Sequence, residues 1–130
     1  MTTAIGIKKQ SRKQRLLLVD DHPLVRRGVA DLIAREPDLE LCGEAADMTE
    51  AMSELERTNP DLVVLDLSLK SGHGLDLLEK IKARDPRVKT LVSSMHDETL
   101  FAERVLRAGA MGYITKQEPP ETLLGAIRQV

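Results

Sequence analysis

Acidic residues stand next to two of the most apolar segments of the chain. Asp20 and Asp21 directly follow residues 16–19, and Asp66 lies inside the run 62–67, whose other five residues are all apolar. If a fold brings these carboxylates together, they repel one another unless a cation lies among them. Mg²⁺ usually binds one or two carboxylates together with water and phosphate oxygens. The three acidic residues therefore predict a magnesium site, with Asp66 as a carboxylate that can accept a phosphoryl group.

Two more polar residues follow short segments that favour a strand. Ser94 comes after residues 88–93, and Lys116 comes after residues 112–115. A serine hydroxyl can donate a hydrogen bond to a phosphate oxygen, and lysine is a common phosphate-binding cation. Each residue alone would be ordinary in a loop. Taken together, carboxylates, a hydroxyl and a lysine at the ends of different predicted strands favour phosphoryl chemistry.

The apolar pattern predicts the elements that must position these residues. Short apolar or alternating runs predict five strands, over residues 16–19, 39–45, 62–67, 88–93 and 112–115. Helical spacing of apolar residues predicts five helices between and after them. These are expected over 23–35, from 48 to a stop at Asn59-Pro60, from 74 to a stop at Asp85-Pro86, from a cap at Asp97 to Gly109, and from Pro119-Pro120 onward. Either Asp47 or Thr49 can cap the second of these helices.

The alternation of strands and helices predicts an α/β fold. Short connections of this kind favour a five-stranded parallel sheet with helices on both faces. Right-handed crossovers leave few topologies, of which we expect the flavodoxin-like strand order 2-1-3-4-5. The strand order then reverses between strands one and three, where ligands bind beyond the carboxyl ends. Asp20, Asp21 and Asp66 would share that crevice.

Length and composition exclude several classes of protein. The chain has 130 residues, 42% of them apolar and 31% charged, which is typical of one globular domain. It has no run of about 18 apolar residues and no apolar stretch near its start, so we expect no membrane span and no secretory signal. Cys42 is the only cysteine, which excludes an internal disulfide and fits a cytoplasmic setting. The three histidines, His22, His73 and His96, lack metal-ligand spacing, and we expect them in loops or on the surface.

The charge is unevenly distributed along the chain. Residues 1–15 hold five basic residues and no acid, whereas the remaining 14 basic and 21 acidic residues give residues 16–130 a formal charge of −7. We expect residues 1–14 to be a flexible basic leader. An acidic body argues against nucleic-acid binding by the domain itself.

Four motifs together resemble the receiver domains of bacterial two-component response regulators, and among these the LuxR/NarL-type transcription regulators. They are LLLVDDHP at 16–23, DLVVLDLSLKSGHG at 61–74, SMHDE at 94–98 and AGAMGYITK at 108–116. The resemblance covers residues 15–130, which would form one receiver domain. It also implies a helix-turn-helix DNA-binding domain, which we expect to be absent from this chain.

The resemblance implies a role for each polar residue at the predicted crevice. Asp66 would be the phosphoacceptor. Asp20, Asp21 and Asp66 would bind Mg²⁺, with the backbone carbonyl of Ser68 as a further ligand. Ser94 and Lys116 would bind the phosphoryl group, and Ser94 and Tyr113 would form the switch pair.

The resemblance also implies a function and partners. A sensor histidine kinase would phosphorylate Asp66, and the domain would relay the signal to transcription, with dimerisation on phosphorylation as an option. The domain would not be an enzyme beyond its own Mg²⁺-dependent phosphorylation and dephosphorylation. Lys70 and Gln117 depart from the family pattern, which often has proline at both positions.

Two alternatives remain open from the residues. A haloacid-dehalogenase-like phosphohydrolase also uses an aspartate after a strand, but it needs a second aspartate where this chain has Ser68. A receiver that binds partners without phosphorylation is the other alternative. A nucleotide-binding domain is disfavoured because residues 20–23 stand where a glycine-rich turn would be.

Overall fold

The computed structural model describes residues 12–66, 74–94 and 99–130. Strands and helices alternate along the described residues, as the apolar pattern predicts. In chain order they are β1 (Gln14–Val19), α2 (Pro23–Ala34), β2 (Leu39–Ala45), α3 (Met48–Thr58), β3 (Leu62–Asp66), α4 (Gly74–Arg84), β4 (Lys89–Ser94), α5 (Thr99–Arg107), β5 (Gly112–Thr115) and α6 (Pro120–Gln129).

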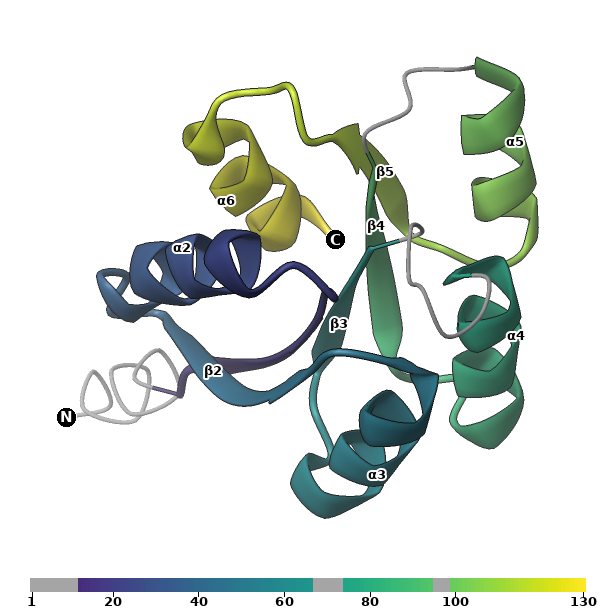
Figure 1. The fold of residues 1–130 in the computed structure, drawn as a ribbon, viewed down its shortest axis with the longest axis horizontal. Helices are drawn as coiled ribbons and strands as arrows, with labels where there is room; N and C mark the ends of the chain where they lie inside the picture. Colours follow the sequence, from purple (N-terminus) through teal and green to yellow (C-terminus); the bar gives the residue numbers. More distant parts are fainter. Residues whose placement is uncertain (1–11, 67–73, 95–98) are drawn as a thin grey trace, which may run out of the picture.

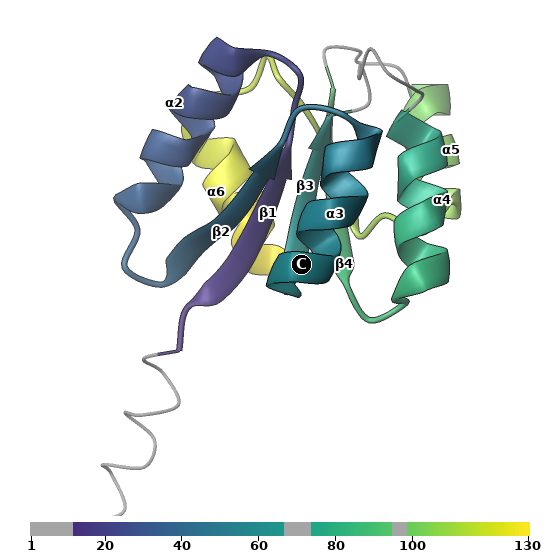
Figure 2. The same cartoon turned by 60° about the horizontal axis from the view of Figure 1, so that its bottom comes forward.

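The strands form one parallel sheet between two layers of helices. Its order is β2-β1-β3-β4-β5, which confirms the predicted 2-1-3-4-5 arrangement. Helices α2 and α6 cover one face of the sheet, and α3, α4 and α5 cover the other (Figures 1 and 2). The reversal of strand order lies between β1 and β3, so a crevice is expected at their carboxyl ends.

The central strand β3 is buried along its whole length because helices cover both of its faces. Its side chains alternate between the two cores. Val63 and Leu65 belong to the apolar cluster under α3, α4 and α5, whereas Leu62 and Val64 belong to the cluster under α2 and α6. Full burial of each such side chain stabilises the fold by about 1.5–3 kcal/mol. Asp66 therefore lies at the end of a strand that is buried along its whole length.

The ends of several elements differ slightly from the predicted ones. Strand β1 begins at Gln14, because its backbone N–H donates to the Asp38 carbonyl oxygen at 2.9 Å and it pairs with Leu39. Strand β4 includes Ser94 as its last residue. Of the two expected caps of α3, Asp47 is the one used, since its side chain accepts a hydrogen bond from the Glu50 backbone N–H. The expected cap Asp97 lies outside the described residues.

Gly109 ends α5 at the predicted place. Its φ of 111° lies in the left-handed region that glycine adopts without strain. Within the described ranges, the helices include none long and apolar enough to cross a membrane.

Candidate functional site

The polar residues predicted for the crevice do converge at the carboxyl end of the sheet. Asp20 follows β1, Asp66 ends β3, Ser94 ends β4 and Lys116 follows β5. Backbone hydrogen bonds extend the ladder just beyond the strands, from Asp20 N–H to the Ala45 oxygen at 3.0 Å and from Lys116 N–H to the Ser94 oxygen at 2.7 Å. The backbone at these ends is therefore held by the sheet.

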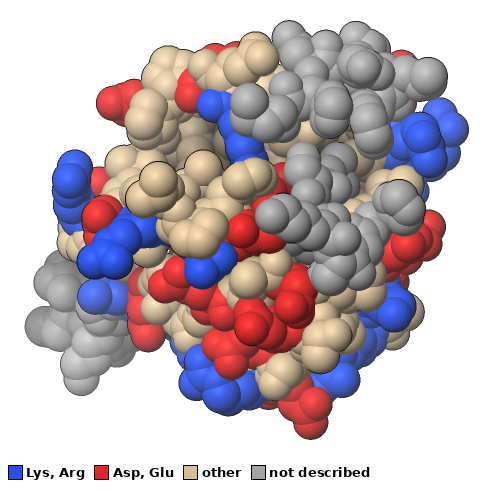
Figure 3. Space-filling view, viewed as in Figure 1, with Lys and Arg blue, Asp and Glu red and all other residues tan. Residues whose placement is uncertain are grey.

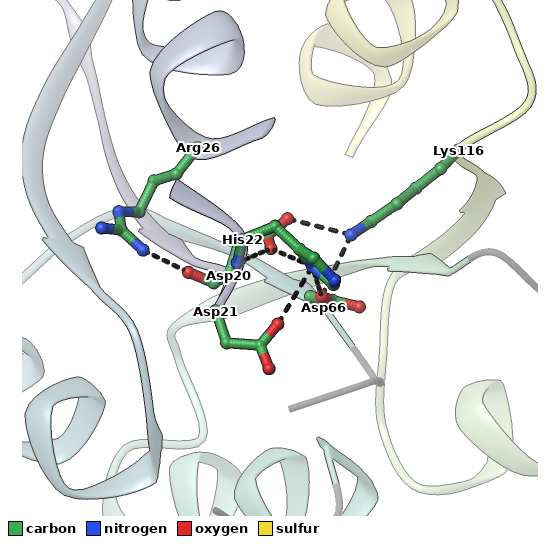
Figure 4. Close-up of polar contacts among 6 residues, drawn as sticks. All are labelled: Asp20, Asp21, His22, Arg26, Asp66 and Lys116. Atoms are coloured by element: carbon green, nitrogen blue, oxygen red, sulfur yellow. Dashed lines mark hydrogen bonds and ion pairs between the residues drawn. The ribbon is translucent and has the colours of Figure 1, made fainter. Parts of the chain in front are cut away.

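Lys116 joins the two buried carboxylates of the site. Its Nζ lies 2.9 Å from Asp20 Oδ2 and 3.0 Å from Asp66 Oδ2, and its side chain is only 12% exposed (Figure 4). Asp20 and Asp66 are both buried. Charged side chains are rarely buried unless they are paired, so this lysine is what makes the two acids tolerable together.

The hydrogen bonds between these groups shift the pKa values of Asp20 and Lys116 in the directions that keep both groups charged. Burial by itself raises the pKa of Asp20, but the hydrogen bonds from the His22 backbone N–H and the Lys116 ammonium outweigh it and leave the pKa below its ordinary value. Burial lowers the pKa of Lys116, and its hydrogen bonds to Asp20 and Asp66 reverse this and raise it. Asp20 and Lys116 are therefore both charged at neutral pH.

Asp21 completes a group of three carboxylates, and His22 joins it. One side-chain ligand atom from each of Asp20, Asp21, His22 and Asp66 lies within 4.8 Å of the others. Three carboxylates outnumber the single ammonium of Lys116, so the site carries an excess of negative charge. Oxygen donors in this number and with this charge fit a hard divalent ion such as Mg²⁺.

His22 is an exposed loop residue, as the sequence predicts, but despite its lack of metal-ligand spacing its side chain joins the acidic group. It is 51% exposed, but its Nδ1 lies 3.0 Å from Asp21 Oδ1 and 3.2 Å from Asp20 Oδ1. Figure 4 shows the ring turned toward the carboxylates. Its position directly after the two aspartates was the only sequence signal that could have suggested this.

Arg26 is a second residue that sequence reasoning missed. Its Nη1 donates to the Asp20 carbonyl oxygen at 2.6 Å (Figure 4). Its Nε lies 3.2 Å from Glu44 Oε1. The guanidinium thus links α2 to the ends of β1 and β2. It supports the backbone from which the Asp20 side chain projects.

The predicted switch residues Ser94 and Tyr113 lie on the same face of the sheet. Ser94 is fully buried, and it continues the alternation of Val92, which belongs to the core under α3, α4 and α5. Tyr113 is half-buried and packs against that same core. Ser93, by the same alternation, belongs to the opposite face of the sheet.

The expected backbone ligand Ser68 and the two departures from the family pattern, Lys70 and Gln117, are not among the described residues that converge here. Ser68 and Lys70 lie outside the described residues. Gln117 is exposed in the turn that follows β5.

A cleft of about 510 Å³ opens beside the site, between α2 and the segment that joins β5 to α6. Asp20, Asp66 and Lys116 line this cleft together with apolar residues such as Val29 and Leu123. Figure 3 shows acidic side chains gathered near the middle of this face of the molecule. Asp66, although only 2% exposed, thus borders a cleft.

Comparisons with known proteins agree with this geometry. The protein-family model for the response regulator receiver domain matches residues 16–128 of this chain. The chain is 33% identical over 118 residues to the transcriptional regulatory protein DegU of Brevibacillus brevis, covering 91% of this chain and 50% of that protein. It is 36% identical over 114 residues to the nitrate/nitrite response regulator protein NarL of Escherichia coli K12, covering 88% and 53%.

A solved structure shows the same fold. The LuxR-family two-component response regulator from Aurantimonas sp. SI85-9A1 superposes with a TM-score of 0.86 at 40% identity, covering 90% of this chain and 84% of that one. The chain spans about half the length of the curated relatives it matches. The family model covers nearly the whole chain, and the fold agrees with that of the solved relative. The chain therefore belongs to the response regulator receiver domain family, and its relatives are of the LuxR/NarL type.

Proposed function

We propose that this domain is a signalling switch in which Asp66 accepts a phosphoryl group from a sensor histidine kinase. The observation that carries the proposal is the position of Lys116, whose Nζ lies 3.0 Å from Asp66 Oδ2 and 2.9 Å from Asp20 Oδ2. A lysine in this position is already next to the carboxylate that would become an acyl phosphate. Phosphoryl transfer depends mainly on such positioning and on charge stabilisation.

Asp20, Asp21 and Asp66 would hold Mg²⁺, with the backbone carbonyl of Ser68 as the expected further protein ligand. The group of three carboxylates with one nearby ammonium supports this assignment. Mg²⁺ at this place supplies positive charge that offsets the negative charge of the phosphoryl oxygens.

The transfer step follows from the residues at the strand ends. A carboxylate oxygen of Asp66 attacks phosphorus in line, forming the new P–O bond as the P–N bond to the kinase histidine breaks. The electron pair of that bond leaves with the imidazole nitrogen. The ammonium of Lys116 donates to a phosphoryl oxygen, which reduces the charge that builds up there.

Phosphorylation would then change the surface around β5. The new group adds about −1.5 to −2 of charge and three acceptor oxygens. The Ser94 hydroxyl would donate to one of these oxygens, and Tyr113, on the same face, would move into the space that Ser94 leaves. A bias of about 1–3 kcal/mol on the surface of α5, β5 and α6 would change output about 5–150-fold.

The output we propose is transcription. The relatives DegU and NarL are named as regulators, and they are about twice as long as this chain. In the whole protein a helix-turn-helix domain would bind DNA, and phosphorylation could promote dimerisation of the receiver. The receiver fold and the family match do not favour the phosphohydrolase alternative.

The test is phosphorylation by a small-molecule phosphodonor in the presence of Mg²⁺. Intact-mass measurement should show a gain of about 80 Da, the mass of one phosphoryl group. Asp66→Asn should abolish the gain, and Asp31→Asn, which changes an exposed aspartate of α2, should not. A gain that persists in Asp66→Asn would remove Asp66 from the role. A wild-type chain that gains no mass would support a receiver that works without phosphorylation.

A further inference from the structure

The imidazole of His22 is the part of the site to which the proposed function gives no role. Its Nδ1 lies 3.0 Å from Asp21 Oδ1, 3.2 Å from Asp20 Oδ1 and 3.7 Å from Asp66 Oδ2 (Figure 4). One ring N–H donates a single hydrogen bond well and can share itself between two acceptors at most. The nitrogen is within hydrogen-bond distance of Asp20 Oδ1 and also faces two further carboxylates, which is the placement expected of one member of a ligand set.

The distances also fit a shared ion. Ligand atoms at roughly 2.0–2.1 Å from one metal lie about 2.8–3.4 Å from their neighbours in tetrahedral or octahedral geometry. Two of the three distances from Nδ1 fall in this range, and the distance to Asp66 exceeds it slightly. The four ligand atoms lie within 4.8 Å of one another, which is close enough for them to surround one ion after the side chains adjust.

The local structure explains why this ring is available. His22 is the N-cap residue of α2, a position at which side chains usually accept a hydrogen bond from the helix, but its side chain makes no such bond. Its backbone N–H donates to Asp20 Oδ1 at 2.9 Å, which holds the residue against the cluster. Half of the side chain is exposed, so an ion can reach it from solvent.

We infer that His22 is a ligand of the divalent ion and raises the affinity of the site for imidazole-binding metals relative to its affinity for Mg²⁺. The inference deepens the proposed function, because it concerns the same three carboxylates. Oxygen ligands suit Mg²⁺, whereas imidazole suits Zn²⁺, Ni²⁺ and other first-row transition ions. A nitrogen ligand therefore strengthens binding of those ions and adds little for Mg²⁺.

The experiment is calorimetric titration of the chain with Mg²⁺, Ni²⁺ and Zn²⁺ in turn. His22→Ala and His22→Asn both remove the imidazole, and asparagine keeps a good N-cap for α2. Both variants should bind Ni²⁺ and Zn²⁺ about tenfold or more weakly than the wild type, by analogy with the loss of other groups that support a metal. Their Mg²⁺ affinity should change by less than about twofold, because Mg²⁺ prefers oxygen ligands.

The control is Leu24→Ala, which changes an 86% exposed residue in the first turn of the same helix and leaves the charge unaltered. It should bind all three ions as the wild type does. A spectroscopic measurement identifies the ligand directly, since Mn²⁺ bound to the wild type should show nitrogen coupling in pulsed electron paramagnetic resonance. That coupling should be absent in His22→Ala.

Two results would overturn the inference. The first is unchanged Ni²⁺ and Zn²⁺ affinity in both His22 variants, and the second is nitrogen coupling that survives in His22→Ala. Either result leaves the proposed function intact if Mg²⁺ still binds and Asp66 still gains a phosphoryl group. Conversely, a chain that shows the His22-dependent preference but gains no phosphoryl group contradicts the proposed function and supports the inference.

Discussion

At the scale of single residues, Lys116 is what allows two carboxylates to be buried together. Its ammonium contacts Asp20 and Asp66 on neighbouring strands. Removing one partner of a buried charged pair usually costs more than the pair contributes, because the remaining charge stays buried. The stability of the ion-free domain should therefore depend on this lysine, and the dependence should vary with pH.

Lys116→Met should lower the free energy of unfolding by about 1–3 kcal/mol at neutral pH without divalent ions, the usual cost of leaving a buried polar group unpaired. The pKa of Asp20 is lowered in the folded domain, so its pairing with Lys116 is fully present above the ordinary value of 3.8. The contribution is lost as pH falls through the lowered pKa, when Asp20 becomes protonated. Urea unfolding over a pH series measures the difference.

The control for this prediction is Lys80→Met, which changes an exposed lysine of α4. It should have little effect at any pH. A Lys116→Met variant whose destabilisation at neutral pH is no greater than that of the control would contradict the role of the lysine. A destabilisation that grows as the pH falls would contradict it as well.

At the scale of elements, the turn from β2 into α3 is held by side-chain contacts that sequence patterns show only in part. Asp47 is an example, because its side chain accepts a hydrogen bond from Glu50 N–H at 2.8 Å, and Glu50 Oε1 accepts one from Ala46 N–H at 2.8 Å. This reciprocal cap fixes the start of α3 directly after β2, which ends beside β1. The turn from β2 into α3 is therefore held next to the acidic site.

Asp47→Ala should destabilise the domain by about 1 kcal/mol, within the range measured for loss of an N-cap. Asp47→Asn should restore most of that loss, because asparagine caps a helix as well as aspartate does. Thr49→Ala is the matched control, since the sequence allowed Thr49 as the cap and the structure leaves it exposed. Thermal unfolding of the three variants decides the matter, and a loss in Thr49→Ala equal to that in Asp47→Ala would count against the assignment.

At the scale of the whole molecule, the site exists only because four strands end at one edge of the sheet. β1 and β3 pair directly in the sheet although residues 20–61 separate them along the chain. The reversal of strand order between them leaves the crevice open, and α2 and α6 border the cleft that leads to it. Because this edge carries an excess of negative charge, binding of a divalent ion there should stabilise the whole folded domain.

Mg²⁺ should stabilise the folded domain by about 2.7 kcal/mol at a concentration one hundred times its Kd. Asp21→Asn should abolish most of this gain, because it removes one carboxylate from the group of three. Without Mg²⁺ the same variant should be at least as stable as the wild type, since it relieves repulsion. Unfolding with and without Mg²⁺ gives both numbers, with Asp31→Asn as the control. Equal stabilisation of Asp21→Asn and wild type by Mg²⁺ would place the ion elsewhere.

The sequence predicted the strand–helix alternation, the strand order and most of the site. These follow from local patterns, because apolar periodicity identifies each strand and its last residues then lie at the carboxyl edge. Asp20, Asp66, Ser94 and Lys116 were found in this way, and the structure brings Asp20, Asp66 and Lys116 into contact at the ends of different strands. The choice between Asp47 and Thr49 as a cap was left open, since either residue can accept the hydrogen bond.

The sequence by itself determined which polar residues stand at which strand ends, because that depends only on the order of residues along the chain. The tertiary structure decided which side chains turn toward one another. His22 faces three carboxylates and Arg26 holds the Asp20 carbonyl oxygen, and neither contact follows from spacing. Both contacts depend on the angle at which α2 leaves β1 and on the packing of β1 between β2 and β3. That angle and that packing are determined by contacts between residues that are far apart in the sequence.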